Sequence, residues 1–423
     1  MEKSVLMKVL IVSTFDIQGG AARAAYRLHK SLLVQDIDSQ MLVQNKSGDD
    51  FTIIVEDKKS IKYFNKLRPI IDSLPVRFYK NRLKTLFSSS WVGFSNIVDK
   101  INKIDPDIVH LHWICGGMIK IEDIARIKAP IVWSLHDMWA FTGGCHYDEG
   151  CGDYKNSCGN CKVLGSNKEK DLSRKVFKRK QKTYSQKQNM TIIGLSHWLQ
   201  VVAKGSSLFN TKKVINLPNP IDTAIFKPFD REKARELWNL PKDKKLILFG
   251  AMSATSDSRK GFDELSEAMH KLTDRNVEFV VFGSSEPKVS QNFGFNTHYL
   301  GQLHDVASLV TLYSAVDVMI VPSLQENLSN AIMESLSCGT PVVCFNIGGN
   351  SDMVIHKENG YLAEPFNTTD LANGIEWVLN TPNYKDLCKN AREKVVKEFD
   401  SKIVAKKYIA LYNSILSKYG KTG

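Results

Sequence analysis

The chain has 423 residues, of which 43% are hydrophobic and 24% are charged, and its formal net charge is +12. This composition is ordinary for a globular protein, and the length predicts two domains. No run of about 18 apolar residues occurs, which argues against a membrane-spanning helix. The apolar N-terminus is interrupted by Lys8 and lacks a small-residue cleavage site, so we expect a buried strand there instead of a signal peptide.

The positive charge is concentrated in the first half of the chain. Up to Pro218 there are 34 Lys and Arg against 20 Asp and Glu, whereas the remainder has 23 against 25. Much of the excess lies in residues 58–87, which also contain many apolar side chains, and in residues 168–187. These segments are either solvated helical faces or surfaces attracted to an anionic membrane or lipid pyrophosphate. Nucleic acid is a weaker alternative, since no recognition-module pattern accompanies the charge.

Short apolar runs alternate with helical patterns along the chain. In the first half, strands are predicted at 7–14, 38–45, 107–113, 130–137 and 191–198. A helix is predicted over 21–33, and residues 214–222, with two prolines, indicate a linker. In the second half, strands are predicted at 245–252, 277–284, 317–323 and 340–346. Apolar strands separated by helices predict two doubly wound α/β domains, each with a parallel sheet covered on both faces.

These elements predict three parts of the chain. Residues 1–218 form a first Rossmann-like domain with a cysteine-rich loop insertion, residues 219–400 form a second, and residues 401–423 form an amphipathic helix that packs back on the first. In such folds ligands bind outside the carboxyl ends of the strands. We therefore expect the site in a cleft where the two sets of strand ends face each other.

The segment ENLSNAIMESLSCGTPVV, residues 326–343, places two carboxylates around a helix start. Glu326 is expected in the loop after a strand and Glu334 about one turn into the helix, with Ser329 or Asn330 as the N-cap. A helix N-terminus attracts phosphate, and a nearby carboxylate accepts hydrogen bonds from sugar hydroxyls. The alternative is structural, with Glu334 facing solvent and Glu326 in an ordinary loop.

Two further positions fit a diphosphate ligand. Arg259 and Lys260 precede Gly261 at a strand-to-helix connection, where they are placed to clamp a diphosphate. Gly19 and Gly20 follow the first strand, where the missing Cβ atoms let backbone N–H groups approach a phosphate. This pair alone is a weak signal, because it is not the G-x-G-x-x-G dinucleotide fingerprint.

Together these motifs resemble the signature of retaining glycosyltransferases of the GT-B fold, the large family-4 group. The matching segments are VLIVSTFDIQGGAARAAYRL, WSLHD, LPNPIDTAIFKP, RKGFDEL and ENLSNAIMESLSCGTPVV. They occur in the expected order and cover nearly the whole chain. The segment GCHYDEGCGDYKNSCGNC resembles a subgroup that acts in exopolysaccharide, capsule or O-antigen assembly, including colanic-acid-type transferases.

The resemblance implies a role for each matching position in the second domain. Glu326 would contact the donor sugar hydroxyls, Glu334 would hold the donor ribose, and Arg259 with Lys260 would neutralise the leaving diphosphate. The backbone of the helix start would touch sugar and phosphate, at Asn327, Leu328, Ser329 and Asn330. Many relatives carry an Arg where this chain has Met252 and Ser253, so Arg259 would supply that charge here.

The resemblance implies that the second domain binds the donor and the first domain the acceptor. In the first domain it places Gly19 and Gly20 near the phosphate and His136 near the reacting sugar. It further implies same-face transfer, in which the departing phosphate takes the acceptor's proton, so the protein mainly stabilises the leaving group and orients the reactants. No D-x-D motif is evident at the expected cleft, which predicts transfer without a catalytic metal. The nucleotide sugar is a co-substrate, and no cofactor is expected.

Four of the eight cysteines, Cys145, Cys151, Cys158 and Cys161, lie within one short segment. They are interpreted as a structural zinc site in which His146 is an alternative ligand, as free or redox-active thiols, or as two disulfides. His110 and His112 alternate along a strand, and we expect them on opposite faces, one in the core and one in the cleft.

The sequence thus predicts a retaining hexosyltransferase that uses a UDP- or GDP-sugar and a glycan or lipid-linked acceptor in surface polysaccharide biosynthesis. We expect it in the cytoplasm, either free or at the cytoplasmic face of the inner membrane, with no nucleic-acid partner. The alternatives are a GT-B nucleotide-sugar epimerase, a zinc-containing nucleic-acid-binding protein, and an adaptor that keeps the fold without activity.

Overall fold

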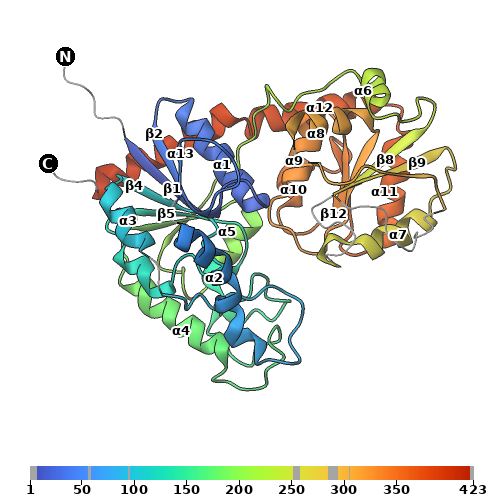
Figure 1. Cartoon of the computed structure of the whole chain (residues 1–423). Helices are drawn as coiled ribbons and strands as arrows, with labels where there is room; N and C mark the ends of the chain where they lie inside the picture. The colour runs from blue at the N-terminus through green and yellow to red at the C-terminus, as the bar shows by residue number, and fades with distance from the viewer. Residues whose placement is uncertain are drawn as a thin grey trace, which may run out of the picture. The chain divides into compact units, whose positions relative to one another are not determined.

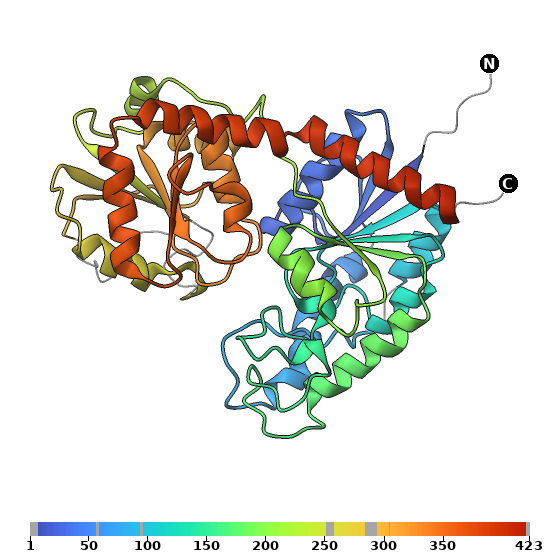
Figure 2. The ribbon, with the colours of Figure 1, turned by 180° about the vertical axis from the view of Figure 1, so that it is seen from behind.

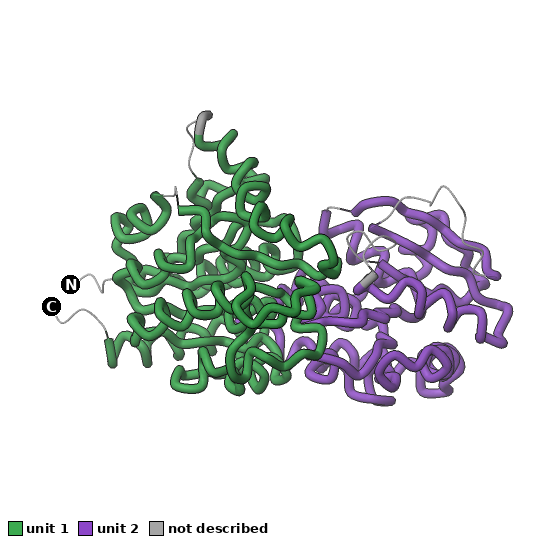
Figure 3. The backbone as a smooth tube through the Cα atoms, turned by 90° about the horizontal axis from the view of Figure 1, so that it is seen from below, with its two compact units in different colours: residues 1–219, 404–423 green, residues 220–403 purple. Residues whose placement is uncertain are grey.

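The computed structural model describes residues 7–55, 59–93, 96–250, 258–283, 294–303 and 305–419. The chain forms two compact units (Figure 1, Figure 3). Unit 1 contains Met1–Asn219 and Val404–Gly423, and unit 2 contains Pro220–Ile403. Met252 and Ser253, which replace the arginine expected from the resemblance, lie outside the described residues.

Unit 1 is built on a parallel sheet with the strand order β3-β2-β1-β4-β5-β6-β7. Its strands are β1 Lys8–Phe15, β2 Asp38–Asn45, β3 Ile53–Ile54, β4 Ile108–Leu111, β5 Ile131–Leu135, β6 Met190–Gly194 and β7 Lys213–Asn216. In the central strand β1, Val9 lies between Ser39 of β2 and Ile108 of β4. Every residue of β4, β5 and β6 is buried, because helices cover both faces of the sheet (Figure 2).

The helices of unit 1 mostly follow the predicted alternation. They are α1 Gly20–Leu33, α2 Lys59–Arg77, α3 Ile97–Ile104, α4 Leu172–Ser185 and α5 His197–Lys204, with short 3₁₀ turns at Ile121–Arg126, Trp139–Phe141 and Asp153–Lys155. The strand predicted over 191–198 ends earlier, because the Ser196 hydroxyl accepts a hydrogen bond from the N–H of Leu199 at 3.1 Å and starts α5. Residues 214–216 of the predicted linker belong to the edge strand β7, Lys213–Asn216.

The last helix, α13 Ser401–Tyr419, returns to unit 1 from Val404 onward. Tyr408 and Tyr412 on this helix are fully buried. The Tyr412 hydroxyl lies 2.7 Å from Nδ1 of His110 on β4, and the Tyr408 hydroxyl lies 3.4 Å from the hydroxyl of Ser134 on β5. These buried polar contacts fix the helix against two central strands of the unit 1 sheet.

Unit 2 repeats the architecture with the strand order β10-β9-β8-β11-β12-β13. Its strands are β8 Lys245–Gly250, β9 Val277–Phe282, β10 Thr297–Tyr299, β11 Val318–Val321, β12 Val342–Phe345 and β13 Gly360–Ala363. Its helices are α6 Arg231–Leu237, α7 Phe262–His270, α8 Val306–Ala315, α9 Asn330–Ser337, α10 Asn350–Met353, α11 Thr368–Asn380 and α12 Tyr384–Glu398, with a 3₁₀ turn, η4, at Ser258–Lys260.

The predicted fold class is confirmed, since all described strand pairs in both sheets are parallel and helices lie on both faces of each sheet (Figure 1). The apolar strand runs lack alternation for this reason. Within the described ranges, none of the helices has the length and apolar character needed to cross a membrane.

Replacing Tyr412 by Phe tests the anchoring of α13. The change leaves Nδ1 of the buried His110 without its partner, so we expect unit 1 to lose about 1–3 kcal/mol of unfolding free energy. Urea unfolding followed by tryptophan fluorescence measures the loss. Tyr419→Phe, at the exposed end of the same helix, is the control; equal stability of both variants would contradict this anchoring.

Candidate active site

The loop between β11 and α9 carries most of the predicted donor-binding residues. It leaves the sheet after Val321, at the carboxyl end of the central strand β11, and ends at Ser329. The Ser329 hydroxyl accepts a hydrogen bond from the N–H of Ile332 at 3.4 Å, which confirms Ser329 as the predicted N-cap. Asn327, Leu328 and Ser329 are buried. The positive end of the α9 dipole therefore lies at the carboxyl edge of the unit 2 sheet.

Lys260 and Glu326 meet at this edge. Nζ of Lys260 lies 3.3 Å from Oε2 of Glu326, and the other carboxylate oxygen accepts the N–H of Asn327 at 3.2 Å. The carbonyl of the neighbouring Arg259 accepts the N–H of Leu324 at 2.8 Å. The structure thus joins the predicted diphosphate clamp to the predicted sugar-binding loop through both side-chain and backbone contacts.

Two glycines allow this close approach. Gly261 has φ +71° and Gly348 has φ +52°, and both values lie in the left-handed region. A Cβ atom on Gly261 would overlap the carbonyl oxygen of Pro322, and one on Gly348 would overlap the carbonyl oxygen of Glu326. Sequence reasoning missed the role of Gly348, although the pair Gly348-Gly349, one residue beyond the strand predicted over 340–346, was the signal for it.

Glu334 is more enclosed than the sequence indicates. It lies on α9 and is only 3% exposed, and its Oε2 accepts a hydrogen bond from the hydroxyl of Tyr313 on α8 at 3.0 Å. The surface-helix alternative, with this carboxylate facing solvent, is therefore wrong. A ribose hydroxyl that bound Glu334 would join or replace the Tyr313 hydroxyl.

In unit 1, Gly19 directly precedes α1 and Gly20 is the first residue of that helix. Gly19 has φ +91° and is the N-cap of α1, with open space where a Cβ would lie, and Gly20 is exposed. The nearby Asp16 was missed by sequence reasoning. Its buried carboxylate accepts the N–H groups of Ser47 and Gly48 at 2.8 and 2.7 Å, and so ties the loop after β1 to the loop after β2.

The buried His110 and His112 and the half-buried His136 form a group at the carboxyl ends of β4 and β5. The prediction that His110 and His112 point to opposite faces is wrong: their ring centroids are 4.5 Å apart, because side chains two residues apart along a strand share a face. Nδ1 of His112 lies 2.9 Å from Nε2 of His136. Burial lowers the pKa of His110 to about 3 and that of His136 to about 4, and it lowers the pKa of His112 well below its usual value.

Asp137, next to His136, holds the cysteine-rich segment. Oδ2 of Asp137 lies 2.6 Å from Nδ1 of His146, and Nε2 of His146 lies 2.9 Å from the hydroxyl of Ser88. Burial alone would raise the pKa of Asp137, but the contacts with His146 and the N–H of Trp139 outweigh it and lower that pKa. Both ring nitrogens of His146 are thus engaged, so this side chain is no metal ligand here.

The cysteines do not form the predicted zinc site. Cys145, Cys158 and Cys161 are buried and Cys151 is exposed, and none is in a disulfide. Across the described ranges, which include all of these cysteines, no group of three His, Cys, Asp or Glu side chains is placed to hold a metal ion. Cys145 and Cys161 instead pack in an apolar cluster with Val76. Burial raises the pKa of Cys158 to about 12, which keeps this thiol protonated.

Residues 230–395 match the family described as Glycosyl transferases group 1. The putative colanic acid biosynthesis glycosyl transferase WcaC of Escherichia coli K12 is 23% identical over 371 residues, which is 84% of this chain and 86% of the relative. Two other curated relatives are matched over only 58% and 50% of their own lengths.

Two solved structures share the GT-B fold with this chain. Sucrose-phosphate synthase from Thermosynechococcus elongatus superposes with a TM-score of 0.70 at 20% identity, over 98% of this chain and 100% of the other. Anabaena Alr3699/HepE in complex with UDP and glucose superposes with a TM-score of 0.64 at 15% identity, over 96% of this chain and 100% of the other. At sequence identities of 20% and 15%, this structural similarity shows a shared fold.

Replacing Gly348 by Ala tests the packing of the Glu326 loop. The positive φ alone costs about 1–2 kcal/mol, and the overlap with the Glu326 carbonyl adds to it. We therefore expect a lower unfolding midpoint of unit 2 than for Gly301→Ala. That control has φ +67° with nothing within 4 Å of the added Cβ, so it carries the strain without the overlap. Equal losses in the two variants would show that the loop does not need the close approach.

The lowered pKa values of His110, His112 and His136 predict that the protein is less stable in weak acid. Their pKa values are lower in the folded state than in the unfolded state, so the unfolded state binds more protons between about pH 6.5 and 4. Each histidine should then lower the unfolding free energy by about 1.4 kcal/mol per pH unit as the pH falls through this window. Urea unfolding at pH 7, 6 and 5 measures the slope of the unfolding free energy against pH. His110→Gln should reduce this slope by the contribution of one proton, about 1.4 kcal/mol per pH unit. The exposed His270→Gln should leave it unchanged, and a flat profile for the wild type would contradict the prediction.

Proposed function

We propose that the chain, whose residues 230–395 match the family described as Glycosyl transferases group 1, moves a hexose from a UDP- or GDP-sugar to a glycan or lipid-linked acceptor of a surface polysaccharide, with retention at the anomeric carbon. The observation that carries the proposal is the Lys260–Glu326 pair beside the start of α9. The name of WcaC, a colanic acid biosynthesis transferase, supports the acceptor class, and the UDP complex of HepE supports the donor class.

In the proposed donor complex, the diphosphate lies against Lys260 and the N-terminus of α9. A doubly charged phosphate group competes with Glu326 for the ammonium of Lys260, because charge-assisted bonds to phosphate are strong. Glu326 is then freed to accept hydrogen bonds from hydroxyls of the donor sugar. Arg259, whose backbone is fixed to the loop through Leu324, supplies further positive charge. Glu334, together with Tyr313, would hold the ribose.

The transfer step requires these charges in the transition state. The bond between the anomeric carbon and the diphosphate oxygen breaks, and the diphosphate leaves with the electron pair. The acceptor oxygen bonds to the same face of that carbon, and its proton passes to the departing phosphate oxygen. Lys260 and the α9 dipole stabilise the negative charge that develops on the leaving group, and this stabilisation lowers the barrier.

We further propose that unit 1 contributes its carboxyl edge to the acceptor side. The pKa of His136, about 4, keeps this histidine neutral at pH 7. It would therefore act as a hydrogen-bond partner for a sugar hydroxyl and not as a cation. Gly19 and Gly20 would let the start of α1 approach a phosphate. We place this activity in the cytoplasm, where nucleotide sugars are the donors.

Nucleotide binding tests the proposal. UDP, GDP and ADP, each alone and as its glucose conjugate, are titrated by calorimetry and thermal shift. One nucleotide family should bind and raise the unfolding midpoint of the wild type. Lys260→Ala should weaken that binding by about 10-fold to 100-fold, because a bond to a charged group is lost. Glu326→Gln should mainly lower turnover, measured as release of the nucleoside diphosphate in the presence of acceptor.

Lys271→Ala is the matched control, since this exposed lysine follows α7 and pairs with Glu267 at 2.8 Å, away from the β11–α9 loop. Nucleotide affinity should be the same in Lys271→Ala and in the wild type. Failure of all these nucleotides to bind, or equal binding by Lys260→Ala, would contradict the proposed site.

A further inference from the structure

Helix α2 carries large apolar side chains on its outward side. Tyr63, Leu67, Ile70 and Leu74 recur at spacings of three and four residues, which places them in one row, and Phe78 follows directly after the helix. Their exposed fractions are 70%, 38%, 49%, 41% and 85%. We call this row of five residues the α2 stripe. Such a row normally faces the core, and a contiguous exposed one marks an interaction surface.

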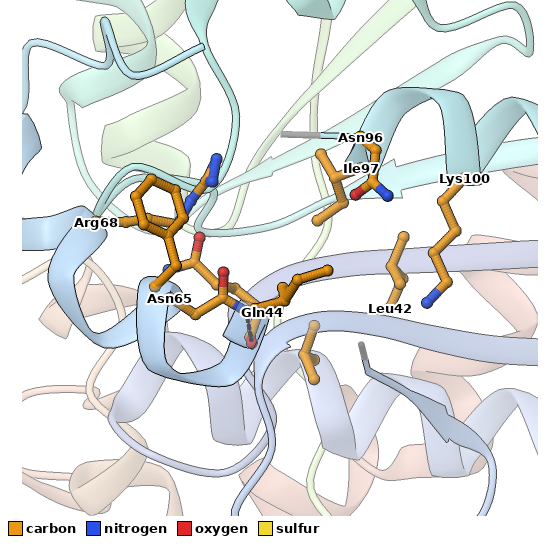
Figure 4. A pocket seen from close by; sticks show the side chains of 10 residues that line it. Leu42, Gln44, Asn65, Arg68, Asn96, Ile97 and Lys100 are labelled. Atoms are coloured by element: carbon orange, nitrogen blue, oxygen red, sulfur yellow. Dashed lines mark hydrogen bonds between the residues drawn. The ribbon is translucent and has the colours of Figure 1, made fainter. Parts of the chain in front are cut away.

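The opposite side of α2 is fixed to unit 1, so the helix cannot rotate to bury the stripe. Nδ2 of Asn65 donates to the carbonyl of Gln44 at 3.0 Å, and Nε of Arg68 donates to the carbonyl of Gly117 at 2.9 Å. Figure 4 shows Asn65 and Arg68 on this inner side, where they line a pocket of about 260 Å³ together with residues of β2 and α3. The inner side, which also includes Ile61 and Phe64, is therefore anchored by hydrogen bonds, while the outer side carries the exposed apolar row.

The surface around the stripe is strongly basic. Six exposed cations lie on α2 and in the segment after it: Lys62, Lys66, Arg77, Lys80, Arg82 and Lys84. The only carboxylate between residues 59 and 86 is Asp72. Asp72 is buried and accepts the N–H of Trp91 at 3.1 Å, so it points away from this surface. The segment itself therefore contributes no exposed carboxylate to this surface, and the carboxylate of Glu149, from the cysteine-rich segment, accepts the hydroxyl of Thr85 near its end.

The second basic segment, on and around α4, differs from the α2 segment in the contacts of its basic side chains and in its lack of exposed large apolar side chains. Arg179 is bound to Glu122 at 2.6 Å, Lys180 donates to the carbonyl of Trp139, and Lys187 donates to the carbonyl of Ile127 at 2.6 Å. Part of the charge of this segment therefore holds unit 1 together. Of the large apolar side chains that the structure shows as exposed, none belongs to α4. Basic charge and exposed apolar surface coincide at α2.

We propose that the α2 stripe docks on an anionic lipid surface, with α2 lying in the plane of the interface. The apolar side chains enter the boundary between headgroups and acyl chains, and the six cations bind lipid phosphates. A nucleic acid would use the cations but leave the stripe in water, and a second copy of this chain would cover the stripe but place like charges against each other. The α2 stripe belongs to unit 1 and the donor residues belong to unit 2, and the proposal does not depend on the proposed reaction.

Flotation with vesicles tests the proposal on the full chain. The wild type should float with vesicles of phosphatidylethanolamine and phosphatidylglycerol in a 3:1 ratio and should not float with pure phosphatidylcholine. Leu67→Gln/Ile70→Gln/Leu74→Gln should lose flotation because the apolar anchor is gone. Lys66→Glu/Arg77→Glu/Lys80→Glu should bind at least about 100-fold more weakly.

Matched controls carry the same chemical changes elsewhere on unit 1. Lys175→Glu/Lys178→Glu/Lys182→Glu alters exposed lysines of α4, and Val34→Gln/Val201→Gln alters exposed apolar residues outside α2. Both controls should float like the wild type, and all variants should keep the unfolding midpoint and nucleotide affinity of the wild type. The proposal is overturned if the wild type fails to float, if the α4 variant loses as much as the α2 charge variant, or if light scattering shows a dimer that the stripe variant abolishes without any vesicle binding.

Discussion

Two close backbone contacts at glycine set the geometry of the candidate site in unit 2. Gly261 lies against the carbonyl of Pro322 and Gly348 against the carbonyl of Glu326, at distances that no side chain permits. These contacts hold the β11–α9 loop between the segment before α7 and the segment before α10. The loop in turn fixes Glu326 beside Lys260 and directs the start of α9 toward the carboxyl edge of the sheet. The charges proposed to bind the donor are therefore positioned by the backbone, and rigid positioning is what electrostatic stabilisation of a leaving group requires.

Unit 1 reaches the same kind of rigidity through buried polar side chains. The histidines at the ends of β4 and β5, the Asp137–His146 contact and the tyrosines of α13 form hydrogen bonds between elements that are far apart in the sequence. Burial keeps His110 and His136 neutral at pH 7. Buried hydrogen bonds of this kind hold the carboxyl edge of the sheet and the cysteine-rich segment together. Helix α2 is likewise held by buried hydrogen bonds, from Asn65 and Arg68, while a row of its apolar side chains is left exposed.

The sequence predicted the parallel sheets, most strand positions and the N-cap at Ser329, because these depend on local pattern. It could not predict partners from distant elements. Tyr313 lies 21 residues before Glu334 and shows no sequence sign of binding it. Charge counting alone did not separate Lys180 and Lys187, which are buried against backbone carbonyls, from the exposed lysines of α2. Cysteine spacing indicated zinc, yet Cys145 and Cys161 pack as apolar side chains. The error on His110 and His112 was avoidable, since residues two apart on a strand share a face.

A crystal structure of the chain with the nucleoside diphosphate that binds it would test the central claim most directly. The account predicts density for the diphosphate against Nζ of Lys260 and the N-terminus of α9, with the carboxylate of Glu326 displaced from its 3.3 Å contact with Lys260. Density for the diphosphate elsewhere, for example in the pocket beneath α2, with the Lys260–Glu326 contact unchanged, would contradict it.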